Sequence, residues 1–407
     1  MSQHIGAPAN PVVKAGDTVY VGTLIGEAGG FVSAPVHSSV SGTVKKIEKY
    51  LMANGKETLA VVIESDGLMT PDPSIAPVSV TTLEELQKAA RDSGLVGLGG
   101  AGFPTSVKLA PRTPVDTLVI NGAECEPYIT SDTRTMIDDA ELVREGVLLV
   151  ASVMGLAHTV VGVEGNKPEA IASLKSAFAD DSAVEVVSLP SRYPQGAEKI
   201  LIANTTGRVV PEGKLPADVG VIVMNVTTVA TLAKYVRTGM PLVEKTITLD
   251  GSAVNEPANL IVPIGMSVKD VVEAAGGFKC EPRKVLFGGP MMGSAMYSLD
   301  SPVMKNCNAI VALDEKDARL PDSTPCIHCG RCVSYCPMGL NPTIFSKSLN
   351  LNDKGDAASR LEDARVNLCI ECGCCSFVCP AKRPLVENNR LAKSALRDWN
   401  AKHNTAN

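Results

Sequence analysis

The chain has few aromatic residues, no excess of basic residues and no long apolar run, and each shortage excludes a class of protein. Only 4% of its 407 residues are Phe, Trp or Tyr, so we expect cores of aliphatic side chains. The formal net charge of -6 offers no basic surface for a nucleic acid. No stretch approaches the ~18 apolar residues that span a bilayer. The first residues lack the basic and apolar segments of a signal peptide. The sequence predicts a soluble protein of roughly two to four domains.

Cysteine is concentrated near the C-terminus, where the pattern C-x2-C-x2-C-x3-C-P occurs twice. The first copy contains Cys326, Cys329, Cys332 and Cys336, and the second contains Cys369, Cys372, Cys375 and Cys379. In such runs three close thiolates bind one 4Fe-4S cluster, and the fourth reaches the neighbouring cluster. We therefore predict one cluster on Cys326, Cys329, Cys332 and Cys379, and a second on Cys369, Cys372, Cys375 and Cys336.

Zinc ribbons and disulfides are the alternatives for these cysteines. Zinc sites usually pair two C-x2-C knuckles, without a third cysteine at the same step or a trailing Cys-Pro. Thiolates that bind clusters suit a reducing cytoplasm, where Cys125, Cys280, Cys307 and Cys374 are expected to be free thiols. Cys374 is adjacent to a predicted ligand, and we expect that it does not bind iron. Two clusters indicate single-electron transfer, so the rest of the chain should supply or accept electrons.

Residues 1–70 predict a small β-sandwich. The order G-D-T-V-Y-V-G-T-L-I-G-E, S-A-P-V and S-V-S-G-T-V resembles lipoyl and biotinyl carrier domains. A carrier needs a lysine at its hairpin tip, and residues 28–34 contain none, so we expect a structural or docking module. His4 and His37 are interpreted as surface or hydrogen-bonded residues. The predicted strands cover 12–14, 18–21, 24–26, 31–32, 40–47 and 59–63.

A glycine-rich stretch follows a helix predicted over 82–93, at whose start Thr82 and Glu85 are spaced as a capping box. Residues 97–103 read G-L-G-G-A-G-F, and Pro104 and Lys108 follow. A dinucleotide fingerprint should follow a strand and open a helix, so the match to G-x-G-x-x-G does not indicate a Rossmann NAD site. Consecutive glycines let backbone N–H groups approach a phosphate or a flat ring, and Lys108 adds a cation. The alternative is a plain glycine turn.

The next part of the chain alternates strands with helices. Strands are predicted at 115–120, 159–163, 184–189 and 219–224, and helices at 139–154, 168–178 and 196–204. This order indicates a parallel sheet with helices on both faces. Asn121, Glu164 and Asn225 come just after strands, and the carboxyl ends of parallel strands meet at one edge. We expect a ligand cleft at this edge of a domain covering 78–240.

Three motifs carry a resemblance to the flavin-binding subunit of respiratory complex I: G-x-G-G-A-G-F-P-T-x-x-K, N-x-x-E-x-E-P and N-V-x-T-x-A. With the β-sandwich, I-N-G-A-E-C-E-P-Y-I-T, G-G-P-M-M-G and the twin cysteine runs, the chain resembles the C-subunit family of Rnf complexes. These complexes are ion-translocating ferredoxin:NAD oxidoreductases. The resemblance implies FMN as cofactor and NAD(H) as substrate. The resemblance implies that the following residues line the FMN: Gly97, Gly99, Gly100, Gly102, Lys108, Asn121, Glu124, Asn225 and Thr228. It also implies that three residues lie nearer the nicotinamide nucleotide: Phe103, Glu126 and Glu164.

The remaining segments complete a multidomain α/β and α+β fold. Strands at 247–249, 259–263 and 285–287 around a helix at 268–275 indicate a β-grasp module over 241–300, similar to the one that follows the flavin domain of complex I. We interpret G-G-P-M-M-G as a methionine-filled turn against the core, with shielding of a cofactor as the alternative. Residues 298–325 are expected to be a linker. A ferredoxin-like two-cluster domain over 315–390 has helices predicted at 342–349 and 357–365. The tail, 391–407, is expected to be helical over 387–401 and then disordered.

A hydride carries two electrons and a cluster accepts one, and a flavin interconverts them. The resemblance therefore implies hydride exchange between NAD(H) and FMN, then single-electron transfer through two 4Fe-4S clusters to partner subunits in a membrane. No side chain is expected to act as a catalytic acid or base. We expect the chain on the cytoplasmic face of the cell membrane, held by those subunits and connected through them to ferredoxin.

Three alternatives remain open. A cobalamin reductase of propanediol-utilising microcompartments has a similar flavin domain and two clusters, but lacks this order of a sandwich before the flavin domain. A non-catalytic iron-sulfur relay would hold iron without flavin. A nucleotide-binding protein with structural clusters is the weakest alternative, because the chain has no Walker lysine-serine pair.

Overall fold

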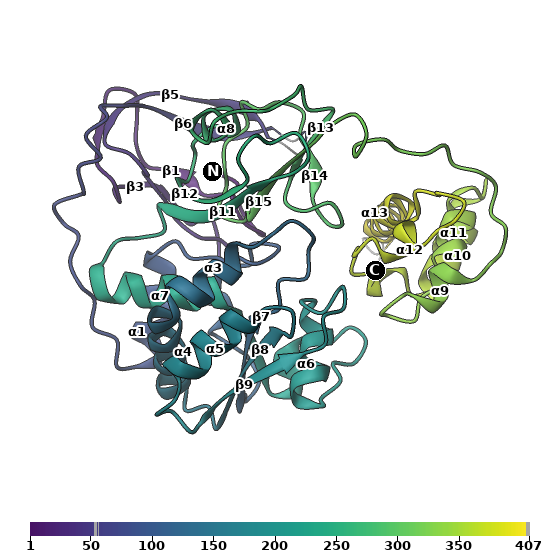
Figure 1. The fold of residues 1–407 in the computed structure, drawn as a ribbon, viewed down its shortest axis with the longest axis horizontal. Helices are drawn as coiled ribbons and strands as arrows, with labels where there is room; N and C mark the ends of the chain where they lie inside the picture. The colour runs from purple at the N-terminus through teal and green to yellow at the C-terminus, as the bar shows by residue number, and fades with distance from the viewer. Residues whose placement is uncertain (53–54, 56, 404–407) are drawn as a thin grey trace. The chain divides into compact units, whose positions relative to one another are not determined.

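The computed structural model describes residues 1–52, 55 and 57–403 (Figure 1). The chain forms two compact units. Unit 1 contains residues 1–210 and 215–318, and unit 2 contains residues 211–214 and the chain from Arg319 onward. The β-rich and α/β segments therefore belong to unit 1, and both cysteine runs belong to unit 2.

The N-terminal segment forms two small sheets around an aliphatic core that includes Val19, Ile25 and Val44. One sheet contains β1 (Asn10–Pro11), β3 (Leu24–Glu27) and β4 (Val36–His37), and the other contains β2 (Thr18–Val19), β5 (Gly42–Leu51) and β6 (Glu57–Ser65). The strands predicted at 12–14 and 31–32 are wrong. At the second position the chain bends, because Ser33 Oγ accepts from the N–H of Gly29 (3.0 Å) and donates to the carbonyl of Ala7 (2.8 Å).

A four-stranded parallel sheet forms the centre of the next domain, as predicted. Its strands are β7 (Thr117–Gly122), β8 (His158–Glu164), β9 (Val184–Leu189) and β10 (Val221–Asn225), in the order β10-β7-β8-β9. The β-branched run of β7 is almost wholly buried, which suits a strand covered on both faces. In the register of β10 on β7, Asn225 is paired with Asn121. The two predicted site residues therefore lie side by side at the carboxyl edge of the sheet.

Helices cover both faces of this sheet (Figure 1). One face packs against α1 (Leu83–Asp92), α4 (Ala140–Met154), α5 (Pro168–Ala177) and α7 (Val226–Thr238), and the other against α6 (Glu198–Thr206). The capping box predicted at Thr82 and Glu85 is present at the start of α1. Sequence patterns did not predict α3 (Ser131–Asp138), whose Ser, Thr and Asp residues are poor helix formers. Tertiary contacts at its first turn, described below, stabilise it instead.

The third domain is a five-stranded sheet with one helix. The strand order is β12-β11-β15-β13-β14, and α8 (Val268–Ala274) packs on it through Val268, Val271 and Val272. The strands are β11 (Glu244–Asp250), β12 (Ala258–Pro263), β13 (Lys284–Phe287), β14 (Ser294–Ala295) and β15 (Ala309–Leu313). The linker predicted over 298–325 is wrong in its middle, because β15 is a fully buried strand that pairs with both β11 and β13.

The three domains of unit 1 are joined by buried polar contacts. The ammonium group of Lys305 donates to the carbonyls of Pro35 in the sandwich and Gly94 in the α/β domain, at 2.6 Å each. Ser39 Oγ donates to the carbonyl of Ile264 in the β-grasp module (2.5 Å). The N–H of Ile5 donates to the carbonyl of Gly102 (3.1 Å), so the N-terminal segment also supports the glycine loop.

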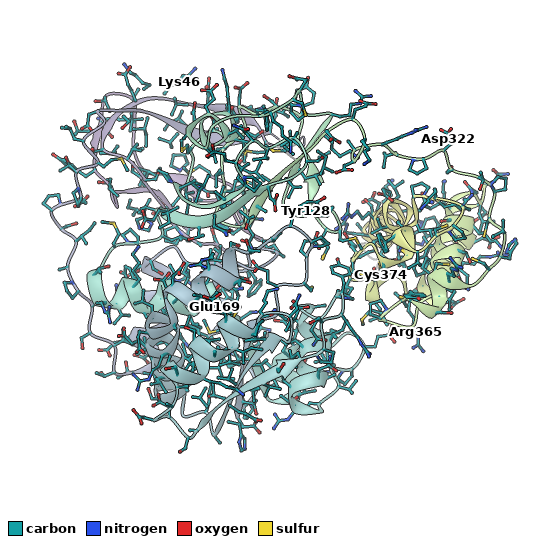
Figure 2. All side chains as sticks on the ribbon, viewed as in Figure 1. Lys46, Tyr128, Glu169, Asp322, Arg365 and Cys374 are labelled. Atoms are coloured by element: carbon teal, nitrogen blue, oxygen red, sulfur yellow. The ribbon has the colours of Figure 1, made fainter. Side chains whose placement is uncertain are left out.

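Unit 2 is helical and has its own small core around Phe345, Leu361 and Leu396. Its helices are α9 (Arg331–Ser334), α10 (Pro342–Leu349), α11 (Lys354–Asp363), α12 (Cys374–Phe377) and α13 (Leu385–His403). Figure 2 marks Asp322, before the first cysteine run, and Cys374, within the second. The disordered end predicted for the tail lies outside the described residues. Within the described part of the chain, no helix is long and apolar enough to cross a membrane.

Candidate functional site

The glycine loop rests against the first turn of α7. Thr228 Oγ1 accepts from the N–H of Leu98 (3.1 Å), and a Cβ on Gly99 would lie 2.2 Å from the side-chain nitrogen of Asn225. Asn225 also caps α7, because its side-chain oxygen accepts from the N–H of Thr228 (3.1 Å). The structure thus brings four of the predicted residues together: Gly99, Gly100, Asn225 and Thr228.

The tip of the loop offers backbone donors. Gly99, Gly100 and Ala101 are exposed, and no hydrogen bond among the described residues uses their N–H groups. A Cβ on Gly100 would meet nothing within 4 Å. Exposed, consecutive N–H groups beside a helix N-terminus commonly bind an anionic phosphate by donating hydrogen bonds to it. These residues therefore fit the phosphate of FMN.

Lys108 follows the loop at the end of the short helix α2 (Thr105–Lys108). Its ammonium donates to Glu198 of α6 and to the carbonyl of Val223 in β10, at 2.9 Å each. The cation predicted for a phosphate is thus paired with the Glu198 carboxylate beside the middle of β10. Gly97 donates its N–H to the carbonyl of Phe103 (2.8 Å), which closes the base of the loop.

Asn121 holds a turn over the end of β7. Its side-chain nitrogen donates to the carbonyl of Gly196 (2.9 Å), and its side-chain oxygen accepts from the N–H of Ala123 (3.1 Å). Gly196 approaches so closely that a Cβ there would lie 2.4 Å from the carbonyl of Ala123. The turn thus lies directly over the residues that leave β7.

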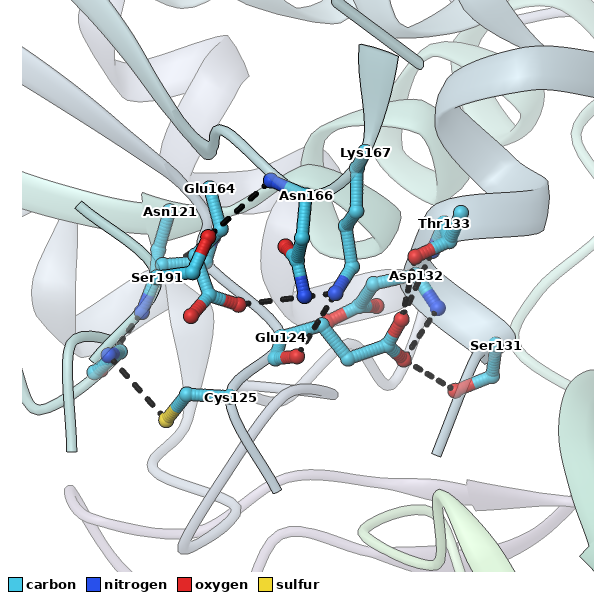
Figure 3. Close-up of polar contacts among 12 residues, drawn as sticks. Asn121, Glu124, Cys125, Ser131, Asp132, Thr133, Glu164, Asn166, Lys167 and Ser191 are labelled. Carbon is cyan, nitrogen blue, oxygen red and sulfur yellow. Dashed lines mark hydrogen bonds and ion pairs between the residues drawn. The ribbon is translucent and has the colours of Figure 1, made fainter. Parts of the chain in front are cut away.

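Glu124 is buried at the start of α3 (Figure 3). Its carboxylate accepts from the N–H groups of Asp132 (2.8 Å) and Thr133 (3.0 Å) and from the hydroxyl of Thr133 (2.7 Å). These contacts supply partners for the first N–H groups of the helix. Burial, together with the nearby charge of Asp132, raises the pKa of Glu124 to about 7.

Asp132 is a site residue that the sequence did not reveal. Its carboxylate accepts from the side-chain nitrogen of Asn225 (2.7 Å) and from the hydroxyl of Thr227 (2.6 Å), so it fixes the residue that contacts the glycine loop. Burial raises the pKa of Asp132 above its usual range. In the sequence the only signal was one acid in a polar stretch, which is typical of a loop.

Lys167 is a second missed residue. Its ammonium donates to the carbonyl of Glu124 (2.9 Å) and lies 3.5 Å from Glu164 Oε2 (Figure 3). Glu164 is 3% exposed, and this oxygen has no hydrogen-bond partner among the described residues. Burial raises the pKa of Glu164, and Lys167 opposes that shift. Within the described part of the chain, this buried carboxylate oxygen has only the Lys167 ammonium, at ion-pair distance, as a partner, so it can still accept a hydrogen bond from a ligand with polar groups.

The carboxylate of Glu126 is hydrogen-bonded to the β-grasp module. One of its carboxylate oxygens accepts from the N–H groups of Met291 (2.7 Å) and Met292 (2.8 Å). It also forms a side-chain hydrogen bond with Tyr193. Burial raises the pKa of Glu126, and the two backbone donors oppose that shift.

The eight predicted cluster ligands line two separate hollows within unit 2. One is lined by Cys326, Cys329, Cys332 and Cys379, and the other by Cys336, Cys369, Cys372 and Cys375. Each hollow thus combines three cysteines of one run with the last cysteine of the other. Cys374 also lines the second hollow. Among the described residues, no three His, Cys, Asp or Glu side chains gather as ligands of a single metal ion.

Asn389 of α13 reaches two of these thiols. Its side-chain nitrogen lies 3.5 Å from Cys369 Sγ and 3.8 Å from Cys375 Sγ, both within hydrogen-bond range for sulfur. Asn389 is 2% exposed. Sequence patterns did not indicate this residue, because the helix brings it back from beyond the cysteine run.

Four family models match successive parts of the chain. Residues 1–68 match the RnfC barrel sandwich hybrid domain, and residues 90–234 match the Nuo51 FMN-binding domain. Residues 246–295 match the SLBB domain, and residues 319–380 match the 4Fe-4S dicluster domain. The predicted cofactor types, FMN and two 4Fe-4S clusters, are confirmed at the level of domains.

Curated relatives cover nearly all of the chain. The C subunit of the Na(+)-translocating ferredoxin:NAD(+) oxidoreductase complex of Acetobacterium woodii is 47% identical over 97% of this chain and 90% of its own length. The chain belongs to the family of Rnf complex C subunits. The C subunit of the proton-translocating complex of Clostridium ljungdahlii is 44% identical, over 84% of this chain and 76% of its own length. The C subunit of the ion-translocating oxidoreductase complex of Rhodobacter capsulatus is 39% identical, over 88% of this chain and 70% of its own length.

Solved structures with a similar fold belong to a different enzyme. Two crystal structures of an NAD+-reducing [NiFe]-hydrogenase, in the H2-reduced and air-oxidized states, match with TM-scores of 0.53 and 0.55 at 20% identity. In each, the match covers 79% of this chain and 61% of the hydrogenase chain. At this identity the likeness shows the fold alone. The predicted family and multidomain fold are thus confirmed, whereas the individual site residues and domain boundaries stay predictions.

Proposed function

We propose that the chain is the NAD(H)-oxidising or NAD+-reducing subunit of a ferredoxin:NAD oxidoreductase complex. It exchanges a hydride with the nicotinamide nucleotide at its FMN domain and passes electrons singly through the two clusters. FMN, when bound, supplies the conversion between a hydride and single electrons. The observation that carries the proposal is the combination, in a member of this family, of an FMN-binding domain with a 4Fe-4S dicluster domain.

In this proposal the glycine loop and the first turn of α7 bind the FMN phosphate. The exposed N–H groups of Gly99, Gly100 and Ala101 are its donors. Asn225 and Thr228 hold the loop in place, because they contact Gly99 and Leu98. Asp132 in turn orients Asn225.

A second part of the proposed site, at the ends of β7 and β8, is polar and buried. Lys167 lies between the main chain of Glu124 and the carboxylate of Glu164, so it fixes the ends of β7 and β8 relative to each other. At this edge of the sheet the charge of Glu164 is partly neutralised by Lys167, and burial limits access of water. Such an environment orients a flavin or nucleotide without adding an acid or base to the reaction. The eight cysteines of the two hollows are the proposed cluster ligands.

The proposed partners are the other subunits of a membrane complex. The relatives are named as subunits of such complexes. We propose that this chain is peripheral at the cytoplasmic face of the cell membrane, attached through those subunits, and that electrons reach or leave ferredoxin through them.

Anaerobic reconstitution with iron, sulfide and FMN, followed by addition of NADH, tests the proposal. We expect one FMN and about eight irons per chain, bleaching of the visible flavin band by NADH, and electron-paramagnetic-resonance signals of reduced clusters. Bound flavin that NADH does not bleach would contradict the assigned substrate. Iron without bound flavin would favour the non-catalytic relay.

A further inference from the structure

The turn between β13 and β14, residues 288–293, is attached to the end of β7 by one side chain. Glu126 accepts both the Met291 and the Met292 N–H on a single oxygen. The turn also packs tightly on it, because a Cβ on Gly289 would lie 2.0 Å from Glu126 Cγ. Glycine is therefore required at position 289 for this approach. We name this contact the Glu126 latch.

The β-grasp module is docked to the same segment by other contacts. The N–H of Thr130 donates to Thr248 Oγ1 (3.0 Å), and Thr130 Oγ1 contacts Asn259 (2.9 Å). Ile129 packs in one apolar cluster with Leu286 and residues of β15. Because these contacts do not involve Glu126, loss of the latch should free the turn without undocking the module.

The latch also adjoins the carboxyl edge of the parallel sheet. Glu126 is two residues from Glu124, whose carbonyl accepts from Lys167 beside Glu164. Its other partner, Tyr193, lies in the turn whose Gly196 is held by Asn121. The segment that follows β7 therefore contacts both the turn at 288–293 and the residues that line the proposed FMN and nucleotide site.

We infer that Glu126 is a positioning residue, which holds the turn at 288–293 as a wall of the NAD(H) site and does not itself bind the nucleotide. The resemblance to complex I placed Glu126 near the nicotinamide, but its hydrogen bonds go to the β-grasp turn. The inference rests on the proposed function, since it assigns a wall to that site. The exposed Met292, half of whose surface is accessible (50%), gives this wall an apolar outer rim.

Hydrogen exchange on the reconstituted full-length protein measures the latch directly. In Glu126→Ala we expect the Met291 and Met292 amides to exchange about tenfold faster or more, because each loses a charge-assisted hydrogen bond. Exchange in β11 and β12 should be unchanged. In NADH-dependent ferricyanide reduction, the KM for NADH should rise several-fold while kcat and FMN content stay near wild type.

Three further variants make the result specific. Glu126→Gln retains an acceptor oxygen and should restore slow exchange and most of the affinity, whereas Gly289→Ala should reproduce the Glu126→Ala result without removing the carboxylate. Glu281→Gln removes an exposed charge from the same module and should change nothing.

Unchanged exchange of the two amides in Glu126→Ala would overturn the latch. Faster exchange with an unchanged KM would overturn the assignment of the turn to the nucleotide site. A wild-type protein that NADH does not reduce would instead contradict the proposed function, and the exchange data would still report on the latch.

Discussion

Gly99 and Gly100 are adjacent in the loop, but the space around their Cα atoms differs. A methyl group on Gly99 would lie 2.2 Å from the side chain of Asn225, which Asp132 and the α7 cap hold in place. We expect Gly99→Ala to destabilise the loop by about 1–3 kcal/mol, as overpacking does, and to lower the FMN content of the purified protein. The measurement is the ratio of flavin to protein after equilibration with limiting FMN.

Gly100→Ala is the matched control, because a methyl group there would meet nothing within 4 Å. It keeps the backbone N–H and should leave the stability of the loop unchanged, so it should lose less FMN than Gly99→Ala. Equal flavin loss in both variants would show that any added side chain, and not the contact with Asn225, disturbs the loop.

Single residues at strand ends were predictable, but their partners were not. Asn121 and Asn225 were identified because each follows a buried strand, and the sheet register places them together. Asp132 contacts Asn225, and Lys167 contacts the carbonyl of Glu124 in addition to its near neighbour Glu164. Local spacing carries no information on the contacts with distant residues. Glu126 shows the same limit, since its partner Met291 is 165 residues away in sequence.

At the scale of elements, α12 and α13 allow a test of the crossed cysteine arrangement. Cys379 lines the hollow of the first run, whereas Asn389, only ten positions later, contacts Cys369 and Cys375 of the other hollow. We expect Cys379→Ser to alter the signal of one cluster and Asn389→Leu to lower the reduction potential of the other. The physical reason is that N–H···S bonds stabilise the extra negative charge of a reduced cluster.

Potentiometric titration followed by electron paramagnetic resonance distinguishes the two clusters. If both substitutions changed the same signal, the clusters would each be bound by one run and the crossing would be wrong. Cys374→Ser is the control, and we expect it to retain the full iron content.

The long, strongly patterned elements were predicted well, and the short or polar ones were not. β7 to β10 and α4 carry enough apolar residues to be identified, and β9 is found at its predicted bounds. By contrast, α3 depends on the carboxylate of Glu124, and β15 is a buried strand whose partners β11 and β13 are far away in sequence. In both cases the stabilising contacts are tertiary, so the local sequence could not specify them.

At the scale of the whole molecule, Lys305 joins three domains of unit 1 and makes its stability depend on pH. Burial lowers the pKa of Lys305 from its ordinary 10.5 to about 7. Between these values the unfolded chain binds a proton that the folded chain releases, so the free energy of unfolding rises with pH across this window. Below about pH 7 both states are protonated, and the Lys305 contribution is constant.

We therefore expect the Tm to rise more between pH 7 and pH 9.5 in the wild type than in Lys305→Met, measured anaerobically by differential scanning fluorimetry at constant ionic strength. Lys279→Met, which removes an exposed lysine, is the control and should keep the wild-type slope. Parallel slopes in all three proteins would show that Lys305 is not the group responsible.

The pairing of the two hollows has a consequence for biosynthesis. The ribosome releases Cys326, Cys329 and Cys332 well before Cys379, yet all four line one hollow. If they share a cluster, the first half of unit 2 cannot complete its metal centre during translation. Iron loading would then have to wait until almost the entire chain has been made, and a polypeptide terminated between the two cysteine runs would carry neither centre intact.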